Sequence, residues 1–557
     1  MTLQRESTFQ SCTRLIDHPE SFMRHPQPKT ASIPLRIVLT LCSASIWVAI
    51  FPQTDVWPLA WIGLLPFFFV LSRSTGKQAF GLGWLFGMVQ TIGMTYWLYH
   101  AVHFHSSAGL FTGIAFSAAI WGFMGFYQAV FAVFASKIIK NKMPAIVKSM
   151  AVASLWVSLE LIRTHFMSGN PWGLAGQSQA HWLPIIQVCD ITGVYGVSFL
   201  ILLSNYAIFE SIRCGLNARR MAATLVLPLV LVSLALVYGR ARLAHFGREN
   251  LHSPRPSQIM AVVQGSVDQS NRWRQENSDQ IVARHVGMTA AAIENGARLV
   301  VWPETTVPYY LQDRIPEQMV RLLKKAHASL ITGGPRYEFV QKQFSYYNSA
   351  FHLTTTGIAD IQDKMHLLPF GEYFPLSFID VLKLKFSGPR EYIPGSELTV
   401  FNTPVGRAGV LICWEAIFPD LACEFTRQGI DVLIVISNDS WFGRTSAHYQ
   451  HFIMSVFRAV ECRRPVVRAS NTGISGFVEA TGSVSSQLPP FTEGFLLNEL
   501  RTTDAVTFYC RYGDVFAFSC VLFLLALTVV QRRMASMTVP ADANGQGNKV
   551  SRTGWSN

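Results

Sequence analysis

Long apolar segments alternate with short polar ones over nearly the first half of the chain, and one more apolar segment lies close to the carboxyl end. A helix that crosses a bilayer needs about 20 mainly apolar residues. The pattern predicts seven such helices followed, after a long interval, by an eighth. The predicted spans are residues 34–52, 57–72, 79–99, 108–136, 144–163, 192–212, 220–240 and 510–530.

The interval between the last two predicted spans has the pattern of a soluble α/β domain. Short β-branched runs, which favour strands, alternate with longer stretches of helical period. Strands that alternate with helices predict sheets covered by helices. The predicted strands are residues 258–263, 298–302, 329–332, 408–412 and 431–437, and the predicted helices include residues 280–294, 317–327 and 448–462.

The composition agrees with a membrane protein that carries a soluble domain. Of 557 residues, 50% are hydrophobic and only 14% are charged, whereas soluble domains average about 25% charged residues. An ordinary cytosolic enzyme is therefore excluded, and 12% aromatic residues exclude a disordered chain. Nine cysteines, an odd number without metal-ligand spacing, argue against a disulfide scaffold and a metal site.

The basic residues lie on alternate loops. The net charge of +12 alone would also suit a nucleic-acid partner, but the placement of the charges along the chain favours a membrane. Lys and Arg cluster after the second, fourth, sixth and last predicted spans, whereas the turn around Asp55 and the turn from His100 to Ser107 hold none. Because basic loops stay in the cytoplasm, seven spans that start inside end outside. The sequence predicts no nucleic-acid partner and an extracytoplasmic α/β domain, which is periplasmic in a bacterium with two membranes.

These boundaries divide the chain into five parts. A secretory signal peptide has an apolar core of about 7 to 15 residues, so the first predicted span is too long to be one. The parts are a cytoplasmic amino-terminal segment (1–32), a membrane domain (33–242), a catalytic domain (243–507), a last transmembrane span (508–533) and a cytoplasmic tail (534–557).

Residues that can carry chemistry stand at the ends of predicted strands. Glu304 and Cys413 each follow a strand, and Lys364 precedes a turn. A single cysteine in an apolar run is usually a small core residue. We expect Cys423 and Cys462 to be of this kind, so that their replacement has only a mild effect on activity. A nucleophile, a base and a cation at strand ends of one α/β domain instead predict an active site, because such sites form where strands end.

These residue types suit acyl transfer through a thioester. A thiol of pKa near 8.5 is mostly protonated at neutral pH and needs a base and a cation to react. We expect Glu304 to accept the proton of Cys413, and Lys364 to stabilise the thiolate and the oxyanion. Three supporting residues are expected. Backbone N–H groups near Trp414 would help to stabilise the oxyanion, and Glu372 and Glu415 would position Lys364 or an incoming amine. An ordinary salt bridge explains Glu415 equally well.

The order of this glutamate, lysine and cysteine resembles the catalytic triad of the nitrilase superfamily. Phe370-Gly371-Glu372 looks like the motif of a second glutamate in that superfamily, and the loop at residues 438–443 resembles the loop after its next strand. The resemblance covers residues 259–500 and implies an α-β-β-α sandwich.

A nitrilase-like domain held between seven spans and one last span resembles, over nearly the whole chain, the apolipoprotein N-acyltransferase family. The resemblance implies transfer of an acyl chain from a phospholipid, through a Cys413 thioester, to the α-amino group of the diacylglyceryl-cysteine of an apolipoprotein, at a bacterial inner membrane. It also implies that Trp273, Trp441 and Phe442 bind substrate. The motifs that carry it are Glu160-Leu161-Ile162-Arg163, Asn170-Pro171-Trp172, Gly193-Val194-Tyr195-Gly196 and Gln264-Gly265 with Trp273, while Trp414 and Asn170 depart from a Tyr and a Phe common in relatives.

Two other functions stay open at this point. One is a membrane-bound nitrilase-like amidase that hydrolyses a small amide, and the other is a non-catalytic transporter or scaffold. An intact triad counts against the scaffold, and eight predicted spans count against the amidase, because one span would tether it.

No cofactor and no metal are predicted. The chain has no Gly-rich phosphate loop, and His100, His103 and His105 lack nearby carboxylates or thiolates. Glu160 and Arg163, three residues apart on a predicted helix, share a face. They could pair with each other or bind a lipid headgroup.

Overall fold

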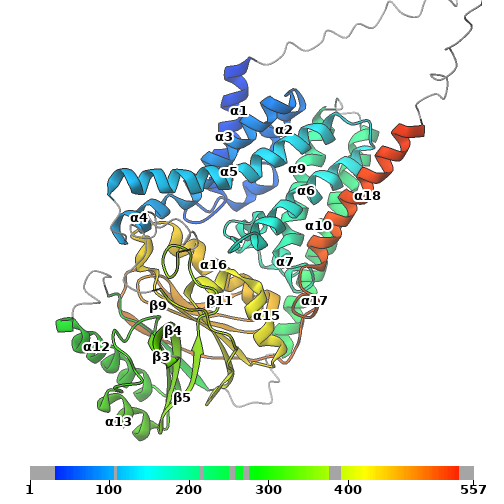
Figure 1. Ribbon diagram of the computed structural model, residues 1–557. Helices are drawn as coiled ribbons and strands as arrows, with labels where there is room; N and C mark the ends of the chain where they lie inside the picture. Colours follow the sequence, from blue (N-terminus) through cyan, green and yellow to red (C-terminus); the bar gives the residue numbers. More distant parts are fainter. Residues whose placement is uncertain are drawn as a thin grey trace, which may run out of the picture.

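The computed structural model describes residues 32–105, 109–213, 215, 218–249, 258–267, 275–340, 342–374 and 391–537. Helices occupy one end of the molecule and a domain of two sheets the other, as Figure 1 shows. The domain is inserted between α10 (Ala218–Glu249) and α17 (Phe508–Tyr512). This arrangement follows the change of pattern along the sequence.

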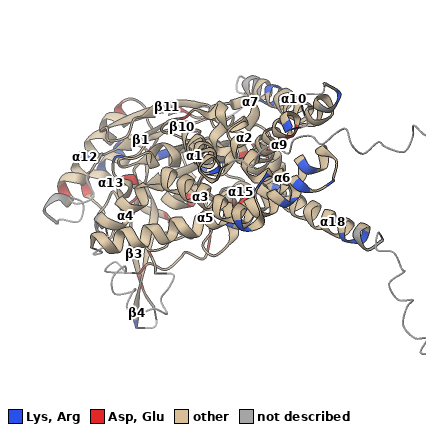
Figure 2. Cartoon of the chain, turned by 90° about the horizontal axis from the view of Figure 1, so that it is seen from above, with Lys and Arg blue, Asp and Glu red and all other residues tan. Residues whose placement is uncertain are grey.

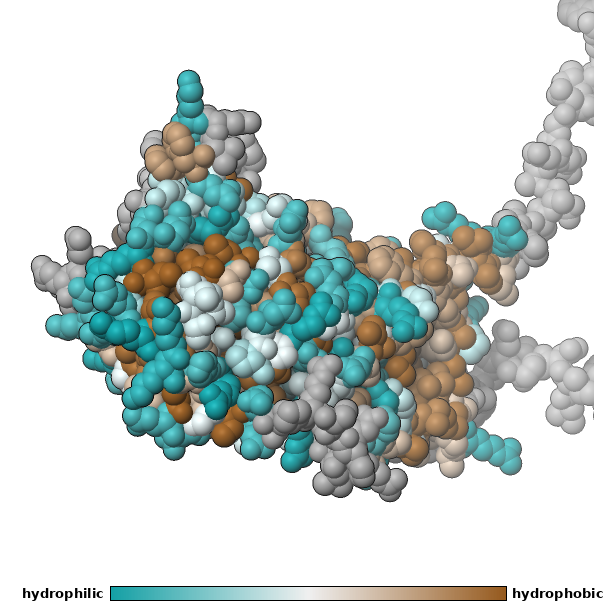
Figure 3. Space-filling model, turned by 90° about the horizontal axis from the view of Figure 1, so that it is seen from below, coloured by the Kyte–Doolittle hydropathy of each residue, from teal (hydrophilic) through white to brown (hydrophobic). Residues whose placement is uncertain are grey.

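Within the described residues, five helices are long and apolar enough to cross a membrane. Each overlaps a predicted span. Brown, hydrophobic atoms dominate the helices at the right of Figure 3, beside a mostly teal domain, and Lys and Arg gather around helix ends away from the domain in Figure 2. The five helices are α5 (Leu110–Lys140), α6 (Ala145–His165), α9 (Val194–Arg213), α10 and α18 (Val515–Met537).

The first three predicted spans form shorter or less apolar helices. In the second, Pro58 and Pro66 each begin a new helix, because proline favours the first helical positions. The helix that the third span forms, Gly76–Thr95, contains five glycines, and a Cβ at Gly87 would lie 2.6 Å from Gly125 of α5, so these two helices pack closely. That the three segments cross the membrane stays a prediction. They are α1 (Ile33–Ala49), a 3-10 helix (Trp57–Trp61) with α2 (Leu65–Ser72), and α3 (Gly76–Thr95).

A helix, α4 (Trp97–His105), replaces the turn that we predicted from His100 onward. The prediction was wrong because apolar residues at positions 97, 98, 101 and 102 continue the helical period. The ring of His103 stacks on Tyr99 with centroids 5.4 Å apart. Among the described residues, neither His100 nor His103 belongs to a group of three side chains that could hold a metal ion.

Two six-stranded sheets lie face to face in the domain, with helices on both outer faces, which is an α-β-β-α sandwich. The strand orders are β12-β1-β2-β3-β4-β5 and β11-β10-β9-β8-β7-β6. The helices α12 (Gln275–Glu294) and α13 (Glu317–Ala326) cover the first sheet, and α15 (Pro419–Arg427) and α16 (Ala447–Cys462) cover the second. The strands are β1 (Ile259–Gln264), β2 (Leu299–Val301), β3 (Ser329–Val340), β4 (Gln343–Thr354), β5 (Gly357–Asp363), β6 (Phe401–Thr403), β7 (Gly406–Ile412), β8 (Val432–Ser437), β9 (Val466–Ser470), β10 (Ser475–Val478), β11 (Val484–Leu488) and β12 (Gly494–Glu499).

The central strands are buried on both faces, which explains why their sequences are continuous apolar runs. In β1, Met260 and Val262 pack between the two sheets, whereas Ala261 and Val263 pack in the cluster under α12 and α13. In the second sheet, Leu411 packs in a cluster that also contains residues of the membrane helices. The strands that carry the site and the membrane helices therefore share one hydrophobic core.

The domain is also fixed to the membrane helices by an ion pair and a disulfide bond. Arg463, after α16, donates to Asp190 of α8 (Cys189–Thr192) at 2.6 and 3.0 Å, and both side chains are buried. Cys423 of α15 is bonded to Cys510 of α17. The prediction that replacement of Cys423 is mild did not include this bond, because the fold brings in a partner 87 residues away. The bond ties the domain to the start of α18.

Candidate active site

Cys413 stands at the turn that leaves β7. Its φ of +55° lies in the left-handed region, which costs energy for a residue with a side chain and persists only where the surroundings hold it. Thr305, directly after Glu304, has a similar φ of +50°. Across from it, a Cβ at Gly333 of β3 would lie 2.6 Å from Glu304 Cα. Tight turns and close packing therefore fix both predicted reactive residues.

Lys364 lies between two carboxylates. Its Nζ donates to Glu372 Oε1 at 2.9 Å and to Glu304 Oε1 at 3.4 Å. The same two oxygens accept hydrogen bonds from Nδ2 of Asn348, at 2.7 Å each. Glu304, Lys364 and Asn348 are buried. The structure thus brings together three residues that we predicted and adds Asn348, which we did not.

Backbone donors orient the other oxygens of the two carboxylates. Glu304 Oε2 accepts from the N–H of Asn438 at 2.9 Å, and Glu372 Oε2 accepts from the N–H of Leu368 at 2.7 Å. Each carboxylate is held at both oxygens, so neither can turn away from the cluster. This leaves the Lys364 ammonium in one defined place.

Burial, more than the charges of the cluster, keeps the Cys413 thiol neutral at rest. Burial, and then the charge of Glu304, raise the pKa of Cys413 above its usual value, although Lys364 opposes the rise. Burial would lower the pKa of Lys364, but Glu372 and Glu304 raise it above its usual value. The nucleophile therefore forms only when a base takes the thiol proton.

Glu415 bonds the backbone next to Lys364. Its carboxylate accepts from the backbone N–H groups of Met365 and His366, at 2.5 and 3.1 Å, and from that of Ile412, at 2.7 Å. Within the described part of the chain Lys364 pairs with Glu304 and Glu372, and backbone donors rather than a salt bridge hold Glu415. Glu415 joins the segment after Lys364 to the strand that ends at Cys413, and that it positions Lys364 stays a prediction.

A buried histidine that the sequence did not single out supports Cys413. His451 Nε2 lies 3.2 Å from the Cys413 carbonyl oxygen, and its Nδ1 lies 2.8 Å from the guanidinium of Arg468. Burial and the charge of Arg468 lower the pKa of His451, which favours the neutral ring. Nδ1 also lies 2.9 Å from Oδ1 of Asp439, which is itself paired with Arg468, so the ring links the strained turn to this buried ion pair.

One cavity of about 2100 Å³ contains the whole cluster. Its walls come from the catalytic domain and from α3, α4, α5 and the segment after α6. Trp441 and Phe442 line it, and the Phe442 ring lies 4.7 Å from that of Trp97 in α4. Trp414 also lines it and stacks on Trp172 at 6.1 Å. Trp273, the third predicted substrate-binding residue, lies outside the described residues.

The membrane side of the cavity is one face of α5. The lining residues are spaced by three or four positions, as one face of a helix requires, and at 1.5 Å per residue they extend over about 16 Å. One leaflet provides half of a hydrocarbon core of about 30 Å, so this wall has about the length of one acyl chain. The residues are Phe116, Ala119, Ile120, Phe123, Met124 and Tyr127.

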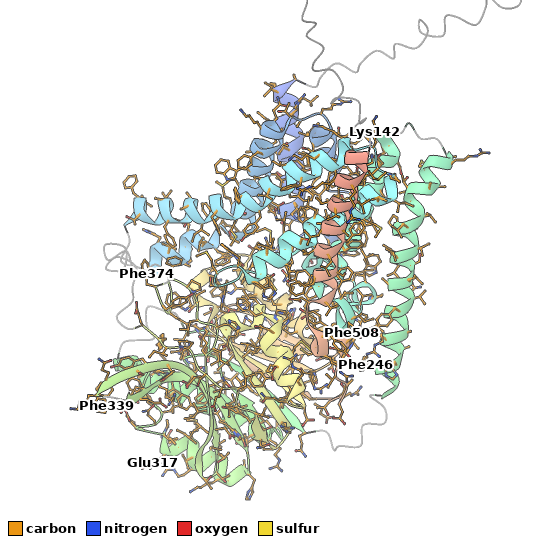
Figure 4. All side chains as sticks on the ribbon, turned by 45° about the vertical axis from the view of Figure 1, so that its right-hand side comes forward. Lys142, Phe246, Glu317, Phe339, Phe374 and Phe508 are labelled. Carbon is orange, nitrogen blue, oxygen red and sulfur yellow. A yellow bond between two sulfur atoms is a disulfide. The ribbon has the colours of Figure 1, made fainter. Side chains whose placement is uncertain are left out.

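The phenylalanines below α5 mark the junction of the two parts. Phe374 is buried and packs near Phe116 of α5, Val102 of α4 and Phe370. Figure 4 shows Phe374 just below these helices, at the upper end of the domain. The cavity therefore lies where an apolar substrate in the membrane would meet the reacting groups.

Glu160 and Arg163 do not pair with each other. Glu160 Oε1 accepts from Trp156 Nε1 at 2.8 Å and from the N–H of Ala175 at 2.7 Å. Arg163 donates to the carbonyl of Gly173 at 3.2 Å and lines the cavity. Glu160 thus holds the chain after α6, whereas Arg163 faces the substrate space.

Comparison with known proteins finds relatives over both parts. A sequence profile described as the apolipoprotein N-acyltransferase N-terminal domain matches residues 43–207, and one described as carbon-nitrogen hydrolase matches residues 259–507. An apolipoprotein N-acyltransferase of Geobacter metallireducens is 35% identical over 513 residues, which are 90% of this chain and 96% of that protein. A protein of the same name from Pseudomonas syringae pv. tomato is 29% identical over 87% of this chain and 95% of its own length.

Among solved structures, a nitrilase-superfamily protein of Saccharomyces cerevisiae is similar with a TM-score of 0.34 and 22% identity. The match covers 44% of this chain and 90% of that one.

Proposed function

The chain belongs to the apolipoprotein N-acyltransferases and is a multi-pass membrane enzyme that N-acylates lipoproteins, and we propose that it works through a thioester on Cys413 with a phospholipid as the acyl donor. One observation carries this mechanism. A single cavity holds Cys413, Glu304 and Lys364 and is walled by apolar helices of the membrane part. The reacting groups and a space for an acyl chain are therefore continuous.

In the first step Cys413 Sγ attacks the ester carbonyl carbon of the phospholipid, and Glu304 accepts the thiol proton. Lys364, with backbone N–H groups near Trp414, stabilises the oxyanion that forms. When the oxyanion collapses, the ester C–O bond breaks and Glu304 returns the proton to the leaving oxygen. A lysophospholipid departs and a thioester remains.

In the second step the α-amino group of the acceptor's diacylglyceryl-cysteine attacks the thioester carbonyl. Its proton passes to Glu304, the C–S bond breaks, and the proton returns to the sulfur of Cys413. Glu372 and Asn348 hold Lys364 and Glu304 in place for both steps. The product is an amide and the free enzyme.

An apolar cavity favours the amine over water as second nucleophile. The face of α5 accommodates the acyl chain, and Trp441 and Phe442, which line the same cavity, bind the substrates around it. Trp273 stays the third predicted substrate-binding residue. Because these walls exclude water, the thioester persists until an amine is held beside it. A membrane-bound amidase would need water at the same place.

We infer that the enzyme lies in the bacterial inner membrane with its catalytic domain in the periplasm. The bond between Cys423 and Cys510 supports this, because disulfides persist mainly in oxidising compartments. We expect a reporter fused near Ser253 to behave as extracytoplasmic and one fused after Arg533 as cytoplasmic. A cytoplasmic signal at Ser253 would contradict the orientation and would mean that the spans are miscounted.

The kinetics distinguish the acyltransferase from a hydrolase. The purified protein mixed with phospholipid alone should release about one equivalent of lysophospholipid in a burst and then stall, because the thioester accumulates. A diacylglyceryl-cysteine peptide added afterwards should discharge the enzyme as an N-acyl product. Both steps can be followed by mass spectrometry of the lipid and of the intact protein.

Two other outcomes of this experiment would count against the proposal. Steady release of free fatty acid without any acceptor would favour the amidase, because water would then be the second nucleophile. No release at all from the folded protein in phospholipid would favour a scaffold without activity.

A further inference from the structure

The hairpin of β3 and β4 projects from the body of the molecule, as Figure 2 shows. Successive residues of a strand point to opposite faces, and the two faces of this hairpin differ. On one face Arg336 donates to both Asp363 and Glu338. This face is polar and its charges are paired with one another.

The other face of the hairpin carries aromatic rings. The register places Tyr337 opposite Tyr346 and, one step nearer the tip, Phe339 opposite Phe344. The ring centroids of Phe339 and Phe344 are 4.8 Å apart, those of Tyr337 and Phe344 are 5.7 Å apart, and Tyr310 lies 4.7 Å from Tyr337. These five residues form one continuous surface, which we call the aromatic face.

The inner end of the aromatic face is the active site. Asn348, which bonds both carboxylates of the cluster, lies two residues beyond Tyr346 on the same face, opposite Pro335. Tyr310, Tyr346, Pro335 and Asn348 all line the cavity. The rings therefore begin beside the reacting groups.

The outer end of the aromatic face is open. Phe339 is 62% exposed and Phe344 is 56% exposed. Figure 4 shows Phe339 at the outer edge of the domain, farther from the membrane helices than Phe374. From Asn348 to Phe344 the strand advances by about 14 Å, at about 3.4 Å per residue. Neighbouring exposed aromatic rings are typical of surfaces that bind a partner.

We propose that the aromatic face binds the polypeptide of the acceptor lipoprotein, over about the first four residues after its lipidated cysteine. This inference rests on the proposed function. The lipid of the acceptor stays with the apolar helices. The polypeptide of the acceptor must therefore extend from the reacting amine toward the aqueous side. The aromatic face runs in that direction and is continuous with the site where the amine reacts.

Aromatic rings also suit the recognition that this acceptor requires. Their faces pack against an extended chain largely irrespective of its side chains. An enzyme whose acceptors are defined by their first residue gains affinity in this way without selecting among the sequences that follow.

The test replaces both exposed rings in the full chain, by Phe339→Ser with Phe344→Ser. Acyl-enzyme formation from phospholipid should be unchanged. The KM for transfer to a diacylglyceryl-cysteine peptide with about six further residues should rise about tenfold, as for loss of a central aromatic contact, whereas the KM for diacylglyceryl-cysteine without a peptide should not change. Phe339→Trp with Phe344→Trp should restore the parental KM.

Val484→Ser, at a residue of β11 that is 38% exposed, is the matched control and should leave every step unchanged. A parental KM for the longer peptide in the Ser variant would overturn the proposal. An equal rise with both acceptors, together with weaker binding of the variant to phospholipid vesicles, would overturn it in favour of a membrane contact. A parent protein that forms no acyl-enzyme would refute the proposed function instead, since that step precedes the acceptor.

Discussion

Cys413→Ala is expected to abolish acyl-enzyme formation, because no other group in the cluster can form the thioester. Intact-protein mass spectrometry after incubation with phospholipid should show one added acyl chain on the parent and none on the variant. The variant should fold normally, since Cys413 is a small side chain at the edge of the cavity and its loss leaves the hydrogen bonds of Lys364 and Glu304 intact.

The choice of control cysteine follows from the structure. Cys423 is in a disulfide bond, and the sulfur of Cys462 lies 3.5 Å from that of Cys510, so replacing either would disturb the joint between the two parts. Cys520→Ala and Cys42→Ala change free cysteines of α18 and α1 and should keep the acyl adduct. An adduct of parental amount on Cys413→Ala would mean that the nucleophile has been misassigned.

Glu304→Gln should reduce the rate of the lysophospholipid burst by about 10²- to 10⁴-fold, the usual contribution of a general base. The substitution keeps the size of the side chain, but an amide has only one accepting atom, so either the N–H of Asn438 or the donors of Asn348 and Lys364 lose their acceptor. What it removes is the carboxylate that takes the thiol proton. Because burial is the main cause of the raised pKa of Cys413, the thiol stays protonated near neutral pH in the variant as well. The burst is measured by quenched flow with radiolabelled phospholipid.

Glu424→Gln serves as the control for Glu304→Gln. Glu424 is a half-buried residue of α15 that pairs with Arg427, and its loss should leave the burst rate at the parental value. A parental burst in Glu304→Gln would move the role of base to Glu372, the other carboxylate on Lys364.

The sequence predicts the strands that are buried on both sides and misses those that are not. β1, β7 and β8 are continuous apolar runs, and each was expected within two residues of its observed bounds. β4 mixes exposed aromatic residues with polar ones, so no strand was expected there. Asn348 was missed for the same reason. Its contact with Glu304 depends on where β4 lies in the fold, which the local sequence does not show.

The cavity could not be predicted from local pattern at all. Its walls depend on how α4 and α5 pack on the domain, and the sequence of α4 was interpreted as a turn. Glu415 shows the same limit, since its partners are backbone N–H groups of a segment about 50 residues away. Glu304 and Cys413 could be singled out because each follows a predicted strand, whereas no strand was predicted before Lys364 and the supporting contacts arise only from the tertiary fold.

The pairing of β12 with β1 bears on how the protein is made. Ile259 and Glu499, from the first and last strands of the domain, lie opposite each other. In the orientation that we propose, a chain emerging from the ribosome exports β1 long before β12 exists, so the first sheet keeps an unpaired edge while most of the domain is already outside the membrane. Such edges recruit other chains, and contacts so distant in sequence form slowly. Periplasmic chaperones would therefore be needed most during this interval, and a truncated product that ends before β12 would be a substrate for proteolysis rather than a partly active enzyme.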